Sequence, residues 1–304
     1  MLPRPAHFAL SALLLWGCNA LAQERPQQRE HRADFQTAAN EVFDVVEQFY
    51  DYDPSLPVAP RTVESWEDEG IRYEKVVFTT QNGDRVPGAL ALPLDQTGAV
   101  PVVLLLHGLG NSKERWTRPD RVPLRDSLLA SGIGVFAFDL RLHGERSFEN
   151  DYQNPVYLTF GDSLYIRNRD MIIGSTIDAR RALDYLSTRP EIDPDRMAVA
   201  GYSLGGLIAL YLSALEPRLV TIVGCAVPTT TSPLPTDAFQ FASRATVPAA
   251  LLIGETDWLS SPADARTLHG LLPEESTLVF FDAGHSLPPE FAVDAASWLV
   301  DRLR

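Results

Sequence analysis

Hydrophobic and polar positions follow two different periods along the chain. Between residues 33 and 50, apolar side chains recur at spacings of three and four, which predicts an amphipathic helix. Several prolines follow closely, and they end the helix. Two strand-like stretches, 71–80 and 86–92, then flank the segment Gln81-Asn82-Gly83-Asp84. An Asn-Gly pair between such stretches is a strong hairpin signal, so we predict a docked helix followed by two antiparallel strands.

From residue 100 onward, short apolar runs alternate with helical stretches. Runs that are apolar on both faces are typical of parallel strands buried on both sides. Strand alternating with helix predicts a mostly parallel, doubly wound α/β sheet with right-handed crossovers. The predicted strands cover residues 100–106, 134–138, 197–200, 219–223, 249–253 and 277–281, and the predicted helices cover 124–130, 172–186, 204–215, 263–271 and 291–303.

Two connections, residues 142–170 and 228–246, are longer than such units need and carry several aromatic residues. Long loops in compact domains are usually lids or binding segments, so we predict short lid insertions at both places. The chain then divides into a leader (1–22), an N-terminal helix and linker packed on the body (23–70), and one α/β domain (71–304).

Composition narrows the class of protein. Of the 304 residues, 45% are hydrophobic and 22% are charged, which is typical of a globular protein with a large core and excludes disorder, collagen and a disulfide scaffold. Acidic residues outnumber basic ones by 40 to 26, and the net charge of −14 argues against a nucleic-acid partner. Cys18 and Cys225 lie in very different contexts, so we expect no structural disulfide.

The first residues have the pattern of an export signal. Arg4 precedes an apolar stretch at 8–16, and Ala20-Leu21-Ala22 is a small-residue cleavage pattern directly before Gln23. The apolar stretch is too short to span a bilayer. We therefore expect a periplasmic or secreted protein that begins at Gln23. Two alternatives are a lipoprotein held at a membrane through a lipidated Cys18, whose flanking residues resemble a bacterial lipobox, and a buried N-terminal helix.

The most informative motif is Gly201-Tyr202-Ser203-Leu204-Gly205, which follows an apolar strand and opens a helical stretch. A G-x-S-x-G sequence in this context predicts a nucleophile elbow, in which a tight turn exposes the serine hydroxyl. The helix that follows offers backbone N–H groups to a developing negative charge. The alternative is an ordinary turn serine between two packing glycines.

A serine nucleophile needs a histidine base, which follows it in the chain in this kind of fold. Only His269 and His285 come after Ser203. His269 falls within a helical stretch and is expected on the surface. His285 follows the last predicted strand, at the carboxyl end where α/β sheets place their chemistry, so we predict His285 as the base.

The carboxylate that orients the base is expected after the preceding strand. Glu255 and Asp257 both lie there, and Asp257 is the preferred candidate because one helix and one strand separate it from His285. Asp282 competes by its closeness to the histidine in sequence. Its position three residues earlier on the same strand end favours a role in capping the loop.

Two backbone N–H groups are expected to bind the oxyanion of a tetrahedral intermediate. One belongs to Leu204, directly after the nucleophile, and the other to Leu109 in the loop after an early strand. His107 in that loop is expected to shape it. Lys113 stands where a dinucleotide fingerprint starting at Gly108 needs its third glycine, and zinc and Walker A motifs are absent, so we expect no metal or organic cofactor.

From about residue 71 to the C-terminus, the chain resembles the α/β-hydrolase superfamily, near the dienelactone hydrolase and acyl-esterase branch. The matching motifs are His107-Gly108-Leu109-Gly110, the segment 139–145, the serine elbow, Gly254-Glu255-Thr256-Asp257 and Gly284-His285. The resemblance implies an α/β-hydrolase fold with an N-terminal antiparallel hairpin. It also implies that Asp139, Arg141 and His143 support their loop rather than react, and Leu142 stands where many relatives have glycine. Because the nucleophile is serine, the resemblance implies hydrolysis of carboxylic esters.

We therefore predict an exported serine esterase with the catalytic triad Ser203, Asp257 and His285, acting through an acyl-enzyme on a small-molecule or polymer ester. Trp116, Trp258 and the aromatic residues of both insertions are candidates for the pocket walls, with ordinary packing as the alternative. A serine peptidase resembling the prolyl oligopeptidase catalytic domain and a non-catalytic binding protein with this fold are the rival functions. The acyl and alcohol groups of the substrate and the oligomeric state stay open.

Overall fold

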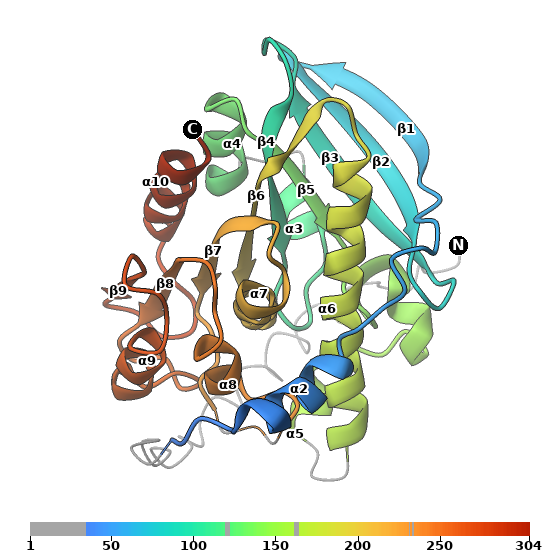
Figure 1. Ribbon diagram of the computed structural model, residues 1–304. Coiled ribbons are helices and arrows are strands. Elements are labelled where there is room, and N and C mark those ends of the chain that lie inside the picture. Colours follow the sequence, from blue (N-terminus) through green and yellow to red (C-terminus); the bar gives the residue numbers. More distant parts are fainter. Residues whose placement is uncertain (1–34, 119–121, 161–163, 231, 233) are drawn as a thin grey trace, which may run out of the picture. The chain divides into compact units, whose positions relative to one another are not determined.

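The chain folds around a mixed β-sheet (Figure 1). The computed structural model describes residues 35–118, 122–160, 164–230, 232 and 234–304. The strands within them are β1 (Arg61–Asp68), β2 (Ile71–Thr79), β3 (Arg85–Pro93), β4 (Val100–Leu106), β5 (Gly134–Phe138), β6 (Ile192–Tyr202), β7 (Leu219–Cys225), β8 (Ala249–Gly254) and β9 (Thr277–Phe281).

These strands pair in the order β1-β2-β3-β5-β4-β6-β7-β8-β9. The pairs β1-β2, β2-β3 and β3-β5 are antiparallel, and every pair from β5 through β9 is parallel. The prediction of a mostly parallel sheet with an N-terminal antiparallel hairpin is confirmed. Strands β4 and β6 lie side by side at the centre, which brings the loops after them together at one edge.

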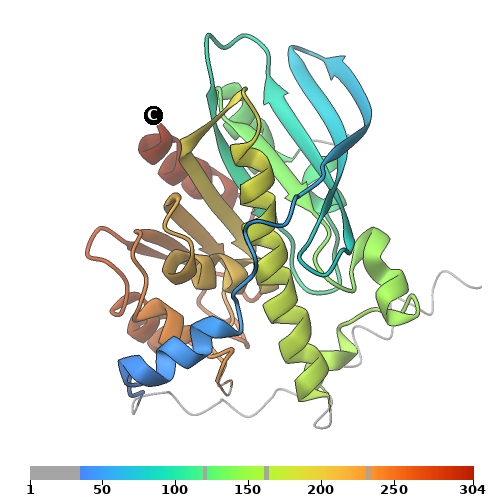
Figure 2. The ribbon, with the colours of Figure 1, turned by 45° about the vertical axis from the view of Figure 1, so that its right-hand side comes forward.

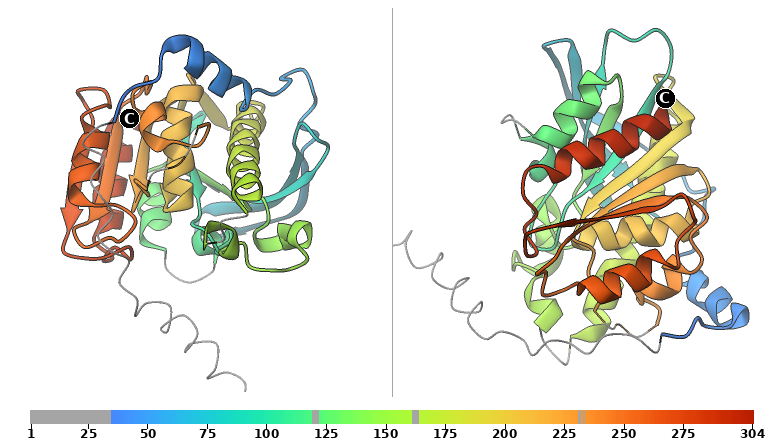
Figure 3. Two further views of the ribbon diagram at one scale, coloured as in Figure 1. Left: turned by 90° about the horizontal axis from the view of Figure 1, so that it is seen from below. Right: turned by 90° about the vertical axis from the view of Figure 1, so that its left-hand side faces the viewer.

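Helices cover both faces of the sheet (Figure 3). One hydrophobic cluster joins the sheet to α6, α7, α8 and α9, and a second cluster joins the opposite face to α4 and α10. The helical elements are α2 (Asn40–Gln48), α3 (Glu114–Thr117), α4 (Pro123–Ala130), the 3₁₀ helix η1 (Gly144–Asn150), α5 (Tyr157–Phe160), α6 (Tyr165–Ser187), α7 (Leu204–Leu215), α8 (Ala238–Ala242), α9 (Pro262–His269) and α10 (Phe291–Leu303).

The predicted N-terminal helix is present but shorter, because α2 spans only Asn40–Gln48. Figure 2 shows it beside α8. The contact is aromatic: the ring of Phe43 lies 5.3 Å from the ring of Phe241, in an edge-on arrangement. Phe35, which the apolar pattern assigns to the helix, lies outside it and packs on Phe239, with ring centroids 5.2 Å apart.

The segment predicted as a linker contains the edge strand β1, so that assignment was wrong. All eight residues of β1 are exposed, and half of them are charged. The strand therefore has no apolar face that its sequence could reveal. The strand exists because it pairs along its length with β2, with a register shift between Thr62 and Glu64. Tertiary pairing, rather than local hydrophobicity, decides this element.

The two predicted insertions are more ordered than loops. The segment 142–170 contains η1 and α5, and α6 already begins at Tyr165, inside the predicted insertion. The segment 228–246 contains α8, whose Phe239 and Phe241 are 0% exposed in the core. Both are packing residues rather than lid residues. The ring of Phe241 lies against α2 and α7, and the ring of Phe239 lies against Phe35, which precedes α2.

Candidate active site

Ser203 occupies a strained turn between β6 and α7. Its φ of 53° and ψ of −113° are unfavourable for a residue with a side chain, and its N–H donates to the carbonyl oxygen of Cys225 at 2.8 Å. Glycines make this turn possible. A Cβ on Gly201 would lie 2.6 Å from the nitrogen of Gly206, and one on Gly205 would lie 2.8 Å from the carbonyl oxygen of His107. Strand, turn and helix therefore approach as a nucleophile elbow requires.

Three predicted site residues meet at this turn. The Nε2 atom of His285 lies 2.8 Å from the Oγ atom of Ser203, and its Nδ1 atom lies 2.9 Å from Oδ2 and 3.1 Å from Oδ1 of Asp257. A carboxylate can only accept a hydrogen bond, so the neutral imidazole carries its proton on Nδ1. Nε2 is then left to accept the serine proton.

The alternative acids lie elsewhere. Asp257 is 5% exposed, and its Oδ1 also accepts the N–H of Leu259 at 2.8 Å, which holds the carboxylate in place. Glu255 and Asp282 are both exposed. His269, the other histidine that follows Ser203 in the chain, has its Nε2 3.2 Å from the carbonyl oxygen of Ser276, away from the triad residues.

A residue that the sequence analysis did not single out holds the loop that carries His285. The hydroxyl of Tyr202 donates to the carbonyl oxygen of His285 at 2.7 Å and accepts the N–H of Leu287 at 2.8 Å. Burial raises the pKa of Tyr202, so the hydroxyl keeps its proton at neutral pH. No sequence pattern marked this role, because the two partners lie 83 and 85 residues further along the chain.

The predicted oxyanion donors lie on both sides of the serine. Leu204 is the first residue of α7, so its N–H has no acceptor within the helix. The loop that carries Leu109 approaches closely, because a Cβ on Gly108 would lie 3.4 Å from the Cβ of Ser203. Two backbone donors near the serine are what stabilisation of an oxyanion requires.

His107 shapes this loop. Its Nε2 accepts the N–H of Leu140 at 3.1 Å, so its proton lies on Nδ1 and is donated to the carbonyl oxygen of Gly108 at 2.8 Å. Burial lowers the pKa of His107 to about 4, which keeps the ring neutral at pH 7. His107 therefore joins the loop after β4 to the loop after β5.

The loop after β5 is a support, as the family resemblance implies. Buried Asp139 accepts hydrogen bonds from the backbone N–H of Lys113 at 2.9 Å, from its Nζ at 2.8 Å and from the N–H of Glu145 at 3.0 Å. Leu142, where relatives have glycine, has a φ of 68° in the left-handed region. Position 142 thus keeps a backbone conformation that favours glycine, although its residue is leucine.

The other supporting residues of this loop are also buried or paired. Arg141 forms an ion pair with Asp178 at 3.3 Å. The Nδ1 atom of His143 lies 2.7 Å from the carbonyl oxygen of Arg141, and burial lowers the pKa of His143 to about 3. Part of the predicted lid lies against the oxyanion loop, because a Cβ on Gly110 would meet the side chains of Asn154 and Val156.

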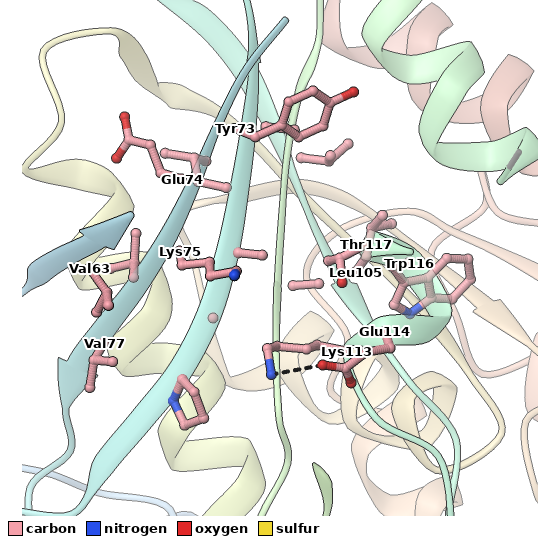
Figure 4. Close-up of a pocket in the computed structure, with 18 of the residues that line it drawn as sticks. Val63, Tyr73, Glu74, Lys75, Val77, Leu105, Lys113, Glu114, Trp116 and Thr117 are labelled. Atoms are coloured by element: carbon pink, nitrogen blue, oxygen red, sulfur yellow. Dashed lines mark ion pairs between the residues drawn. The ribbon is translucent and has the colours of Figure 1, made fainter. Parts of the chain in front are cut away.

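The two tryptophans predicted for the pocket walls lie in different surroundings. Trp258 is 45% exposed, with its ring centroid 6.3 Å from that of His285. Trp116 is 4% exposed and borders a cavity of about 370 Å³ between β1–β3 and α3, where Lys113 pairs with Glu114 (Figure 4). Trp116 also borders a second cavity, between the oxyanion loop and α10.

The described residues contain no group of three or more His, Cys, Asp or Glu side chains arranged to hold a metal ion. In the same part of the chain, no helix is both long enough and apolar enough to cross a bilayer. Cys225 is a free thiol, and burial raises its pKa to about 12, so it stays protonated and unreactive at neutral pH. The predicted export signal and Cys18 lie outside the described residues.

The arrangement defines a class of protein. A serine on a strained turn after β6, an acid after β8 and a histidine after β9, in that order along a mostly parallel sheet, are the features of an α/β-hydrolase. The alpha/beta hydrolase family matches residues 103–302, and the chain belongs to that family. The family predicted from the motifs is confirmed.

Individual relatives are similar over parts of their length. The putative hydrolase YtaP of Bacillus subtilis (strain 168) is 26% identical over 181 residues, covering 55% of this chain and 56% of that protein. Esterase FrsA of Yersinia pestis (strain Pestoides F) is 26% identical over 166 residues, 53% of this chain and 34% of FrsA. The chain thus spans about half or less of these curated relatives.

A solved structure matches over nearly the whole fold. Acetyl xylan esterase 1 from Thermoanaerobacterium sp. JW/SL YS485 superposes with a TM-score of 0.70 at 18% identity, covering 89% of this chain and 96% of the esterase. At this identity the likeness concerns the fold.

Proposed function

We propose that the protein is a serine esterase that hydrolyses carboxylic esters through Ser203, His285 and Asp257. The observation that carries the proposal is the continuous chain of hydrogen bonds from the Ser203 hydroxyl through His285 to buried Asp257. It ends on a serine held at a strained φ of 53°. Both features are typical of an activated nucleophile and neither is required of a serine that only packs in a turn.

The reaction follows from these positions. The Oγ atom of Ser203 attacks the ester carbonyl carbon while Nε2 of His285 takes its proton. The buried carboxylate of Asp257 stabilises the imidazolium that forms. The N–H groups of Leu109 and Leu204 bind the oxyanion of the tetrahedral intermediate. When the intermediate collapses, Nε2–H of His285 protonates the departing alcohol and an acyl-serine remains.

The second half repeats the same steps with water. Nε2 of His285 takes a proton from a water molecule, which attacks the acyl carbonyl and forms a second oxyanion in the same place. Collapse returns the proton to Oγ of Ser203 and releases the acid.

The names of relatives agree with an ester as substrate. FrsA is named an esterase, and the similar solved structure is titled an acetyl xylan esterase. We propose a small-molecule or polymer ester as the substrate class. We also propose that the protein is exported, on the signal pattern that ends at Ala22, and either periplasmic or secreted unless Cys18 is lipidated.

Labelling with a fluorophosphonate probe tests the enzyme class. The purified protein is expected to be labelled on one residue, and Ser203→Ala is expected to abolish labelling while its thermal unfolding stays close to that of the unmodified protein. An unlabelled but folded protein would establish the non-catalytic alternative.

A panel of 4-nitrophenyl esters of increasing acyl length, alongside peptide 4-nitroanilides, tests the reaction. We expect hydrolysis of the esters and much slower cleavage of the anilides. Faster cleavage of the anilides would identify a peptidase. For export, N-terminal sequencing of protein secreted by a bacterial host is expected to begin at Gln23, whereas a chain beginning at lipidated Cys18 would identify a lipoprotein.

A further inference from the structure

Arg115 lies beside the candidate active site, and no acidic residue among those the structure describes pairs with it. Its guanidinium carbon stands 4.4 Å from the ring centroid of Tyr202 and 5.4 Å from that of Trp116. Its Nε atom is buried with no hydrogen-bond partner, and its side chain forms no ion pair with any residue in the described part of the chain. The two aromatic rings attract the guanidinium but provide no hydrogen-bond acceptor to its N–H groups.

The carboxylates closest to Arg115 are engaged by other groups. The nearest carboxylate in sequence, that of Glu114, is engaged by the Nζ of Lys113 at 3.1 Å and by the hydroxyl of Ser112. Lys113 is itself saturated, since it also pairs with Asp139 and Glu145. Burial lowers the pKa of Arg115 from its ordinary value. An arginine guanidinium is always protonated at neutral pH, so the charge remains.

Arg115 lines the cavity between the oxyanion loop and α10, which has a volume of about 450 Å³. Asn111 and Ser112 form its side toward Leu109, and Trp116, Pro289 and Phe291 provide apolar wall. This volume is within the range of small-molecule sites. The lining also includes Arg118 and Glu114, whose carboxylate is engaged by Lys113 and Ser112. An apolar wall beside guanidinium groups suits a ligand with a carbon skeleton and one anionic end.

The cavity adjoins the reacting groups through Tyr202. The ring of Tyr202 lies between the two, with Arg115 at 4.4 Å, the ring of His285 at 6.3 Å and the ring of Phe291 at 5.6 Å. Because Tyr202 directly precedes Ser203 and contacts Arg115, the guanidinium lies beside the candidate active site.

We propose that this cavity binds a carboxylate of the substrate and that Arg115 is the specificity-determining residue. The preferred substrate is then an ester that carries a free carboxylate in addition to the ester group. This inference rests on the proposed esterase function. A guanidinium presents two parallel N–H donors to a carboxylate, and such charge-assisted pairs are about twice as strong as neutral hydrogen bonds.

Matched pairs of esters test the preference. With the carboxylate on the alcohol side, 4-acetoxybenzoate is compared with methyl 4-acetoxybenzoate. With the carboxylate on the acyl side, mono-4-nitrophenyl glutarate is compared with 4-nitrophenyl valerate. We expect the unmodified enzyme to prefer the anionic ester in one pair, and Arg115→Gln to lower that preference, measured as a ratio of kcat/KM values, at least 10-fold. The pair that responds identifies the side of the ester that carries the charge.

Two variants make the result specific. Arg115→Lys keeps the charge without the planar fork and is expected to retain part of the preference. Arg266→Gln is the matched control, because Arg266 also stacks on an aromatic ring, 4.9 Å from that of Phe280, on α9. It is expected to leave the ratio unchanged. If Arg115→Gln lowers hydrolysis of both members of each pair equally, Arg115 serves only to support Tyr202 and the proposal is wrong.

A binding measurement separates this proposal from the esterase proposal. Titration of the anionic ester of the responding pair into folded Ser203→Ala, followed by calorimetry, is expected to show saturable binding that weakens at least 10-fold when Arg115→Gln is added. Binding of this kind by a protein that neither hydrolyses esters nor reacts with fluorophosphonate would retain the carboxylate site and reject the esterase. No binding, together with equal hydrolysis of charged and neutral esters, would reject the carboxylate site.

Discussion

Tyr202→Phe removes a single hydroxyl and isolates its role in holding the loop that carries His285. The ring contacts to Arg115 and Phe291 remain, because they involve the aromatic face and edge. What disappears are two hydrogen bonds, of 2.7 Å to the carbonyl oxygen of His285 and 2.8 Å from the N–H of Leu287. At about 0.5–1.5 kcal/mol for each bond, we expect a loss of about 1–3 kcal/mol in the free energy of unfolding.

Activity is expected to fall as well, but for a different reason. His285 keeps its bonds to Asp257 and Ser203, so the groups that react are unchanged. A loop that samples other positions spends less time with Nε2 in reach of the serine, and a cost of about 1.4 kcal/mol for the productive position lowers kcat about 10-fold. KM is expected to change little, because the hydroxyl faces the loop.

The assay compares urea unfolding, kcat and KM on 4-nitrophenyl acetate for Tyr202→Phe and the unmodified protein. Tyr152→Phe is the control, since Tyr152 is 80% exposed and loses a hydroxyl that faces solvent. If Tyr202→Phe matches the control in both stability and kcat, the two hydrogen bonds do not hold the loop. A fall in kcat without any loss of stability would also contradict the reasoning.

Three further substitutions test other parts of the structure. Asp257→Asn is expected to lower kcat by about 10⁴ through the wrong imidazole tautomer, while exposed Asp282→Asn changes it only a few-fold; the reverse order would refute the assignment of the acid. Gly205→Ala places a Cβ 2.8 Å from the carbonyl oxygen of His107, so we expect a loss of at least about 3 kcal/mol in urea unfolding, and an unchanged midpoint would contradict the close approach. The pKa of His107 is about 4 in the folded protein and about 6.5 in the unfolded chain. The folded protein is therefore fully stabilised above pH 6.5, and up to about 3 kcal/mol of its free energy of unfolding is lost as the pH falls toward 4. His107→Gln is expected to flatten this dependence in unfolding measured between pH 7 and pH 4, and an equal slope in both proteins would show that His107 does not cause it.

Elements with a strong period were predicted from sequence almost to the residue. Strands 134–138 and 277–281 and helices 204–215 and 291–303 have the predicted bounds. Their residues are apolar on the faces that the sheet and helices bury, so local pattern and tertiary burial agree. The serine elbow belongs to the same group, because glycines and a strand-to-helix change within a few residues specify its turn.

Elements without such a pattern depended on partners far away in the chain. Edge strand β1 is exposed along its whole length and forms only because β2 pairs with it. The aromatic residues of α8 were assigned to a lid from their place in a long connection, yet the contact with α2, about 200 residues earlier, puts them in the core. No local window contains either partner.

The candidate site shows the same division. Chain order and strand ends were enough to select Ser203, Asp257 and His285, because residues at the carboxyl ends of neighbouring parallel strands meet at one edge of the sheet. The hydrogen bonds of Tyr202 to the loop after β9, 83 and 85 residues away, had no trace in the sequence. Neither had the lack of an acidic partner for Arg115 among the described residues. Hydrogen bonding and charge neutralisation depend on which side chains meet in space. Only the tertiary structure decides that.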